Sequence, residues 1–187
     1  MGRLYWIVAA VLVAIVVHAG FILMVPALSF ERNVVRLVSD RGANSFFILP
    51  QQEQSALFPA YPLHSVVGVC EFDVSSEQVQ LNASMPEGFW TLTIYSNRGE
   101  VIYAVNNAQT GTNTFTVSLS LAPDIIETLR QSAVKEAIGE DTGWNVKSPA
   151  PRGLAVIWYP VTEGAARAAV VQRISATSCK AVPQPAI

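Results

Sequence analysis

Residues 64–73 contain the side chains best suited to catalysis: a histidine, a cysteine and two carboxylates. Glu71 and Asp73 share one face of an extended strand because side chains alternate, and a carboxylate pair can act as general acid and base. His64 and Cys70 are a candidate base and nucleophile, but an extended chain separates them by about 20 Å, so they meet only if the chain folds back. We expect the commoner roles: a solvated strand face in which Asp73 accepts turn hydrogen bonds, a loop histidine and a structural cysteine.

Composition restricts the other chemistry. A zinc site needs three or four convergent His, Cys, Asp or Glu ligands, whereas one histidine and two distant cysteines lie outside the apolar N-terminal segment. This set of ligands predicts no metal site. No glycine-rich nucleotide-binding motif occurs either, so we predict no cofactor. The chain has 187 residues, 51% hydrophobic and 14% charged, which excludes disorder as the main state. Its 12 basic and 14 acidic residues give no electrostatic reason for a nucleic-acid partner.

The two cysteines predict a disulfide between Cys70 and Cys179. One pair in a domain of this size is typical of an oxidising compartment, and the alternative is two buried, unpaired thiols. The bridge would close a loop of about 100 residues, for which chain entropy predicts roughly 4–5 kcal/mol of stabilisation. A bridge would place the folded domain outside the cytoplasm.

The N-terminal run Leu4–Val25 contains no Asp, Glu, Lys or Arg and predicts a transmembrane helix. Its 22 residues span about 33 Å, slightly more than the hydrocarbon core of a bilayer. We expect Pro26 to end this anchor. The alternative is a cleaved signal peptide with small residues at Val17-His18-Ala19, but the apolar run continues beyond the usual length of a signal. Positive charges flank both ends, so orientation follows from the cysteines, with the N-terminus in the cytoplasm.

One face of this helix carries small and polar side chains. Ala10, Ala14 and His18 recur at a spacing of four residues, which places them on one stripe. Small residues let helices approach closely, and a polar ring in lipid usually faces protein, so the stripe is a candidate contact with a partner helix or a second copy. The alternative is a neutral imidazole near the outer interface, with the alanines there by chance.

Branched or alternating residues predict six strands, and the succession of strands along the chain suggests antiparallel pairing. They cover Val66–Val74, Val79–Ser84, Phe89–Ser96, Glu100–Val105, Thr114–Leu121 and Gly153–Tyr159. The last of these is almost continuously apolar and is expected to be buried on both faces.

Helical spacing predicts a short helix over Phe30–Val38, one from residue 124 to the glycine at 139, and one within Thr162–Ser178 that leads to the second cysteine. Proline-rich residues 50–65 are predicted to be a loop, and Gly143–Pro151 a turn-rich insertion.

These elements predict a mainly β fold with peripheral helices: an antiparallel β-sandwich, jelly-roll-like, preceded by one N-terminal transmembrane helix. Four segments are expected. Residues 1–28 form the anchor, 29–65 a juxtamembrane helix and proline-rich loop, 66–180 the β domain and 181–187 a C-terminal tail.

Aromatic side chains are the remaining candidates for a binding surface, since ring faces supply contact area for a glycan, peptide or lipid. We expect Trp90 and Trp158 to be core residues because both lie in apolar strands, whereas Trp144 lies in a polar segment and is the candidate surface contact. The full set is Trp90, Tyr95, Tyr103, Trp144, Trp158 and Tyr159.

The block from Cys70 to Asn107 resembles a bacterial family named domain of unknown function 1254. The matching segments are Cys-Glu-Phe-Asp-Val-Ser, then Phe-Trp-Thr-Leu-Thr-Ile-Tyr-Ser-Asn, then Val-Ile-Tyr-Ala-Val-Asn-Asn. Val74 stands where the family usually has leucine, and Ser96 where it often has aspartate. The resemblance implies a β-rich envelope module at a bacterial inner membrane; together with the orientation expected from the cysteines, this places the main domain in the periplasm. It implies no reaction.

Three functions are consistent with these patterns. The preferred one is a non-catalytic binding or accessory subunit of a cell-envelope complex, held in the lipid bilayer and contacting a protein partner or a second copy through the transmembrane helix. The alternative is a small envelope enzyme acting on a lipid or glycan, with Glu71 or Asp73 and His64 in its site. A carrier of an apolar ligand is the third, and requires an enclosed apolar cavity between the sheets.

Overall fold

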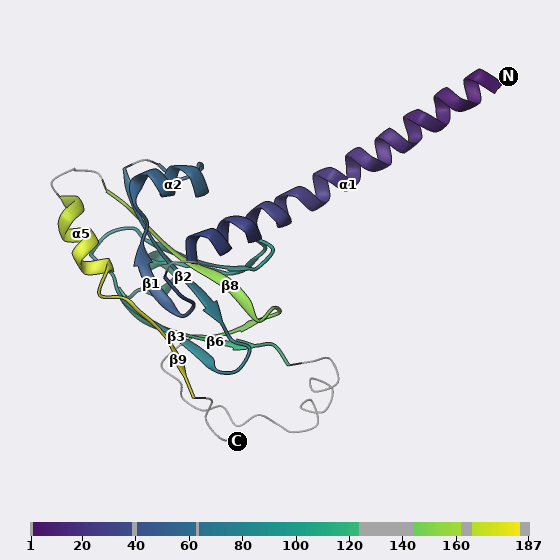
Figure 1. Ribbon diagram of the computed structural model, residues 1–187. Helices are drawn as coiled ribbons and strands as arrows, with labels where there is room; N and C mark the ends of the chain where they lie inside the picture. The colour runs from purple at the N-terminus through teal and green to yellow at the C-terminus, as the bar shows by residue number, and fades with distance from the viewer. Residues whose placement is uncertain (1, 39–40, 63, 124–143, 162–165, 184–187) are drawn as a thin grey trace.

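The structure is a computed structural model that describes residues 2–38, 41–62, 64–123, 144–161 and 166–183. A long N-terminal helix, α1 (Gly2–Val38), extends away from a body of two β-sheets and meets it only at its C-terminal end (Figure 1). The described body contains nine strands and three further helices. The strands are β1 (Ser45–Ile48), β2 (Ser65–Asp73), β3 (Gln78–Ser84), β4 (Thr91–Ser96), β5 (Val101–Asn106), β6 (Thr114–Leu121), β7 (Trp144–Ser148), β8 (Arg152–Pro160) and β9 (Ser178–Val182), and the helices are α2 (Gln51–Leu57), α3 (Asn107–Thr110) and α5 (Arg167–Ile174).

Helix α1 contains the whole predicted apolar run and is long and apolar enough to cross a membrane. The expectation that Pro26 ends the helix was wrong, because α1 continues unbroken to Val38 and includes the segment predicted as a separate helix. Proline costs one backbone hydrogen bond, and packing can offset this cost. Phe30 and Val34, in the later turns of α1, supply such packing by lying against the outer face of the body.

The body consists of a five-stranded sheet in the order β1-β2-β8-β4-β5 and a four-stranded sheet in the order β7-β6-β3-β9. Every pair in the first sheet is antiparallel, as expected. In the second sheet β6 and β7 are parallel, so the expectation of a wholly antiparallel arrangement was wrong. The chain between these two strands runs outside the described residues, and a connection of this length permits a parallel crossover.

The main hydrophobic core lies between the inner faces of the two sheets. Phe72, Trp90 and Leu119 are fully buried there, together with the disulfide. A second cluster covers the outer face of the five-stranded sheet, where α1 and the α2 region pack. Strands β2 and β8 contribute alternate residues to both clusters, and this explains why their sequences are nearly continuously apolar.

Two segments predicted as loops contain regular structure. Residues 51–57 form α2, whose Gln-Gln-Glu-Gln-Ser-Ala-Leu sequence favours helix, and Pro50 precedes its first residue. Residues 144–148 form β7, in which Val146 is buried and Trp144 packs against the core. Strand β1 was not predicted, because four residues are too few to show a clear alternation.

The C-terminal region combines a correct and an incorrect prediction. Helix α5 lies within the segment expected to be helical, with Val170 and Ile174 buried, but it ends at Ile174. Strand β9 follows and pairs with β3. Cys179 therefore lies in a strand and does not directly follow the helix. This strand extends into the segment predicted as the C-terminal tail. The helix predicted from residue 124 to 139 lies outside the described residues.

Candidate functional site

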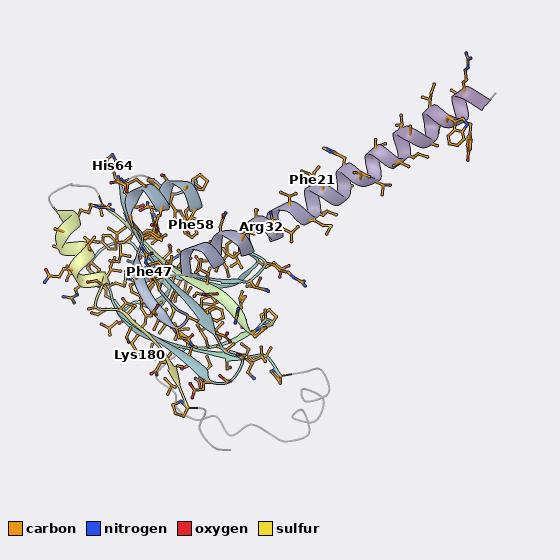
Figure 2. All side chains as sticks on the ribbon, in the orientation of Figure 1. Phe21, Arg32, Phe47, Phe58, His64 and Lys180 are labelled. Carbon is orange, nitrogen blue, oxygen red and sulfur yellow. A yellow bond between two sulfur atoms is a disulfide. The ribbon has the colours of Figure 1, made fainter. Side chains whose placement is uncertain are left out.

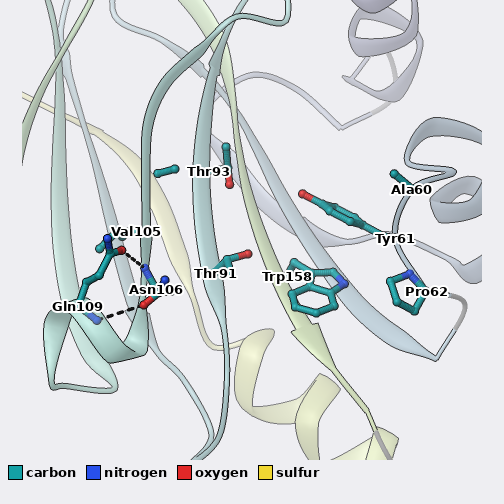
Figure 3. Close-up of a pocket in the computed structure, with 10 residues that line it drawn as sticks. Ala60, Tyr61, Pro62, Thr91, Thr93, Val105, Asn106, Gln109 and Trp158 are labelled. Atoms are coloured by element: carbon teal, nitrogen blue, oxygen red, sulfur yellow. Dashed lines mark hydrogen bonds between the residues drawn. The ribbon is translucent and has the colours of Figure 1, made fainter.

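A groove of about 590 Å³ opens on the outer face of the five-stranded sheet and is called here the outer-face groove. Figure 3 shows Tyr61 and Trp158 on one side, Asn106 and Gln109 on the other, and the threonines Thr91 and Thr93 between them. Its lining residues are Ala60, Tyr61, Pro62, Thr91, Thr93, Ala104, Val105, Asn106, Gln109 and Trp158.

Strand register places the floor of the groove beside its aromatic wall. Thr91 is directly opposite Trp158 on β8 and opposite Asn106 on β5, so the three side chains share the outer face. Thr93 is opposite Ala104, whose small side chain leaves the floor open. The groove is therefore assembled from the β4–β5 hairpin and from β8, which lies about 50 residues further along the chain.

The aromatic wall is one part of a row of four rings. Tyr61 stacks on Phe58 with ring centroids 5.4 Å apart and lies 5.8 Å from Trp158, which meets Phe89 edge to face at 6.0 Å. Phe89 is exposed, at 47% of its surface. The indole Nε1 of Trp158 is buried and has no hydrogen-bond partner among the described residues.

Gln54 holds the loop that carries Tyr61. This side chain is fully buried, and its Nε2 donates to the carbonyl of Pro62 at 3.1 Å and to Ser65 Oγ at 2.6 Å. Ser65 Oγ donates to the same Pro62 carbonyl at 2.6 Å, so α2, the loop and the start of β2 are tied together. The Nε2 contacts hold the loop that carries the aromatic wall, while Gln54 Oε1 is buried without a hydrogen-bond partner among the described residues.

A capping box positions the opposite side of the groove. Asn106 Oδ1 accepts from the backbone N–H of Gln109 at 3.1 Å, and Gln109 Oε1 accepts from the backbone N–H of Asn106 at 3.0 Å. Both side-chain oxygens are thus used at the start of α3. The two side-chain NH₂ groups are the donors that this wall offers to a ligand.

Among the described residues that line the groove there is no Asp, Glu, Lys, Arg or His. The one titratable group among them is Tyr61, whose pKa is raised above the ordinary value by burial and then by hydrogen bonding to Tyr95. The phenol consequently stays protonated at physiological pH, and the described lining is uncharged.

The carboxylate pair is on the same outer face but at a different place. Asp73 accepts from the backbone N–H and hydroxyl of Ser75 at 3.0 and 2.6 Å, as expected, and forms an ion pair with Arg152 at 2.8 Å. These contacts lower the pKa of Asp73, with the Ser75 hydroxyl as the largest cause. Glu71 is buried beside α1 in a small hollow of about 100 Å³ that Phe30 and Val34 also line.

Burial raises the pKa of Glu71, against the attraction of Arg152. The native state then binds a proton more readily than the unfolded chain, so ionised Glu71 destabilises the fold once the pH rises through its range. Glu71→Gln is expected to be more stable than the wild type near neutral pH, by up to about 1 kcal/mol. This difference should shrink as the pH falls below about 4, where both states are protonated.

Thermal unfolding across pH measures this effect, with Glu77→Gln as the matched control because Glu77 is exposed. If Glu71→Gln is less stable than the wild type near neutral pH, Glu71 acts there as a stabilising anion and the assignment of a burial penalty is wrong.

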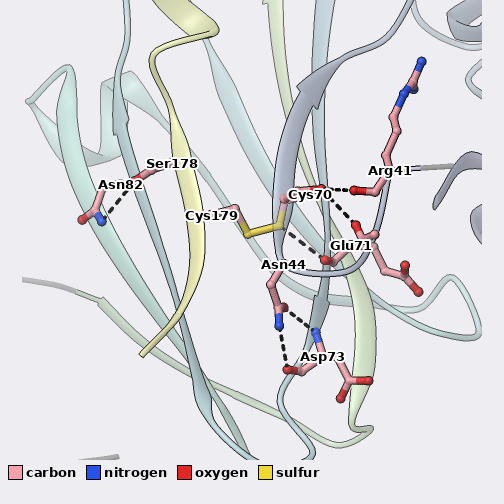
Figure 4. Close-up of a disulfide and its surroundings, with 10 residues drawn as sticks. Arg41, Asn44, Cys70, Glu71, Asp73, Asn82, Ser178 and Cys179 are labelled. Atoms are coloured by element: carbon pink, nitrogen blue, oxygen red, sulfur yellow. Dashed lines mark hydrogen bonds between the residues drawn. A yellow bond between two sulfur atoms is a disulfide. The ribbon is translucent and has the colours of Figure 1, made fainter. Parts of the chain in front are cut away.

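The candidate dyad of His64 and Cys70 does not form, as expected. Cys70 is bonded to Cys179 in a disulfide, as predicted, and therefore has no thiol to act as nucleophile. His64 is exposed at the edge of the body (Figure 2). The disulfide joins β2 of one sheet to β9 of the other, with Cα atoms 6.4 Å apart (Figure 4).

The remaining aromatic candidates are distributed over several places. Trp90 is fully buried, as predicted, and its Nε1 donates to Asn113 Oδ1 at 3.2 Å. Trp158, also predicted in the core, is only partly buried and lines the groove, because its strand position faces outward. Trp144 is half-buried against Phe115, with ring centroids 5.5 Å apart, and also lines a shallow hollow next to β5.

Tyr95, Tyr103 and Tyr159 serve other contacts. Tyr95 packs on Phe30 of α1 at 5.9 Å between centroids and bonds Tyr61. Tyr159 donates a hydrogen bond from its hydroxyl to the Glu87 carbonyl at 2.5 Å. Tyr103 packs against the core between the sheets.

The stripe predicted on the N-terminal helix is exposed. Ala10, Ala14 and His18 all lie in the apolar part of α1, and none of them is covered by the body. Among the described residues, no group of three or more His, Cys, Asp and Glu side chains is placed to hold a metal ion.

Comparison with known proteins supports the fold and no activity. No family model and no curated protein matches the chain. Its structure is similar to that of the VPA0106 protein from Vibrio parahaemolyticus, with a TM-score of 0.61 over 87% of this chain at 12% identity. An uncharacterised protein from Burkholderia cenocepacia gives a TM-score of 0.46 over 86% of the chain at 10% identity. The chain spans 37% and 42% of the lengths of these two proteins.

Proposed function

We propose that this chain is a single-pass bacterial inner-membrane protein that acts as a non-catalytic binding or accessory subunit of a cell-envelope complex. In this proposal α1 is retained, its N-terminus is cytoplasmic and the β body is periplasmic. The observation that carries the proposal is the continuity of α1, whose exposed apolar part leads directly to turns that pack on the β body.

The packing of α1 links the anchor to the groove through a series of side-chain contacts. Val34 is buried against the outer face, and Phe30 contacts Tyr95 at 5.9 Å. The side chain of Tyr95 is hydrogen-bonded to Tyr61, which forms the aromatic wall together with Trp158. A groove held at a fixed position relative to a membrane helix suits a protein that presents a binding surface to envelope components.

Two further observations support the proposed location and architecture. A disulfide is typical of proteins that fold in an oxidising compartment, and the resemblance of residues 70–107 to domain of unknown function 1254 favours the bacterial envelope. We place the two packed sheets in the β-sandwich class, with a jelly-roll-like arrangement. The large side chains that fill the space between them, such as Phe72 and Trp90, argue against an apolar carrier.

A binding role is favoured over an enzymatic one because the candidate catalytic groups are occupied or separated. Glu71 is buried beside α1, Asp73 is held by Ser75 and Arg152, and Cys70 is in the disulfide. Nucleophilic catalysis needs a nucleophile and a base within hydrogen-bond reach, and these residues do not provide that arrangement.

Site-specific photo-crosslinking in native membranes tests the accessory role. A photoreactive residue at Ala14 is expected to form a discrete crosslink to another polypeptide or a second copy. The same residue at Val16, two positions along and thus on the opposite side of the helix, is expected to label mainly lipid. Equal labelling from both positions, or no polypeptide crosslink from either, would contradict the proposed contact.

A further inference from the structure

We infer that the outer-face groove is a binding site for a neutral glycan. This inference goes beyond the proposed function, because it assigns a class of ligand to the groove, whereas the proposed function rests on the membrane anchor. It rests on three features of the lining: its aromatic wall, its hydrogen-bonding groups and its lack of charge.

The aromatic wall supplies the contact that a sugar ring uses. Aromatic faces carry partial negative charge and attract the polarised C–H groups that cover the flat face of a pyranose. Tyr61 and Trp158 stand side by side along the groove, with Phe89 extending the row beyond it. The faces of Tyr61 and Trp158 lie within 34° of each other, whereas Phe89 meets Trp158 edge to face and stands outside the lining. The two lining rings can contact neighbouring sugar units, so a short oligosaccharide fits this wall better than a single sugar.

The floor and the opposite wall supply hydrogen bonds for sugar hydroxyls. The capping box uses the side-chain oxygens of Asn106 and Gln109 and leaves their NH₂ groups as donors. The hydroxyls of Thr91 and Thr93 lie between this wall and the rings, and they can donate or accept. A ligand with many hydroxyls can satisfy these groups while its apolar face lies on the rings.

The absence of charge selects against other ligands. A phosphate or carboxylate would lose hydration in this groove without meeting a cation, which is costly. Nucleic acids and anionic lipid headgroups are disfavoured for the same reason. The volume of about 590 Å³ lies within the usual range for small-molecule sites.

An extended peptide is the competing ligand, and the position of the groove disfavours it. Peptides that bind sheets usually add a strand at an edge, where backbone groups are free. This groove lies on the face of the sheet, and the backbone of β4 on its floor is paired with β5 and with β8. Strand β5 is the edge strand beside the groove, so a peptide that added to β5 would lie along the edge of the sheet and not across this floor.

Binding is tested with the full-length protein in lipid nanodiscs or amine-oxide micelles, since glycoside detergents would compete for the site. The probes are neutral gluco-, manno-, galacto- and N-acetylgluco-oligosaccharides, with an oligogalacturonate as the charged comparison and an uncharged extended peptide as the alternative ligand. Calorimetry and tryptophan fluorescence are expected to show saturable binding of at least one neutral oligosaccharide at millimolar or lower concentration, and weaker or no binding of the other two probes.

Two variants separate groove binding from general effects on the fold. Trp158→Ala is expected to weaken binding by more than about tenfold, whereas Phe47→Ala, which removes a partly buried aromatic ring on β1 at the opposite edge of the same sheet, should leave affinity unchanged. Gln109→Ala changes an exposed side chain and is expected to weaken binding by about fivefold with the fold intact.

The inference is overturned if no neutral oligosaccharide in the panel binds, if binding is unchanged in both groove variants, or if the peptide or the charged sugar binds more tightly. Any of these results leaves the crosslinking test of the membrane helix unaffected, so the two proposals fail separately.

Discussion

Replacement of both cysteines, Cys70→Ala with Cys179→Ala, is expected to lower the stability of the protein by about 4 kcal/mol. The bridge joins residues 109 positions apart, so it removes much of the conformational freedom of the unfolded chain. It also holds the edge strand β9 to β2 of the opposite sheet. For a domain of this size the midpoint of thermal unfolding should fall by about 8–16 °C.

Thermal unfolding of the full-length protein in nanodiscs measures this loss, with and without reductant. The reduced wild type should unfold close to the double variant, and the single variant Cys179→Ala should match both, because each lacks the same constraint. A loss below about 1 kcal/mol in the double variant would show that the bridge contributes little to the fold.

Trp90→Ala is expected to destabilise the fold by about 3–5 kcal/mol. Trp90 is fully buried between the sheets and stacks on Phe115, with ring centroids 4.8 Å apart. Truncation removes this contact, leaves a cavity and leaves Asn113 Oδ1 without the indole N–H.

Chemical denaturation compares this variant with two controls. Trp90→Phe keeps a ring in the core and should lose less stability than Trp90→Ala. Trp144→Ala removes a tryptophan that is only half-buried and should also cost less. If Trp90→Ala costs no more than Trp144→Ala, the assignment of Trp90 to the centre of the core is wrong.

Long strands are the parts of the fold that sequence predicts well, whether they are apolar on both faces, like β2 and β8, or on one face only. Strands β3 and β6 alternate strictly, and both were located nearly to the residue. The strands β1, β7 and β9 are four or five residues long and depend on partners far along the chain, so local pattern does not reveal them.

The outer-face groove was largely outside the reach of sequence analysis. Trp158 was singled out, but an apolar strand buried on both faces does not show which face a given residue occupies. Tyr61 lies in a segment read as a proline-rich loop, and its position depends on the buried amide of Gln54. The capping pattern of Asn106 and Gln109 was present in the sequence and was the one signal that could have located the opposite wall.

The intact mass of the protein extracted from bacterial membranes, measured after thiol alkylation with and without prior reduction, tests the central claim most directly. We expect the mass of the whole chain, 20.2 kDa apart from processing of the first methionine, with alkylation of the cysteines only after reduction. A protein lacking its N-terminal apolar segment, or one alkylated at both cysteines without reduction, would contradict a retained anchor that carries a bridged domain on the oxidising side of the membrane.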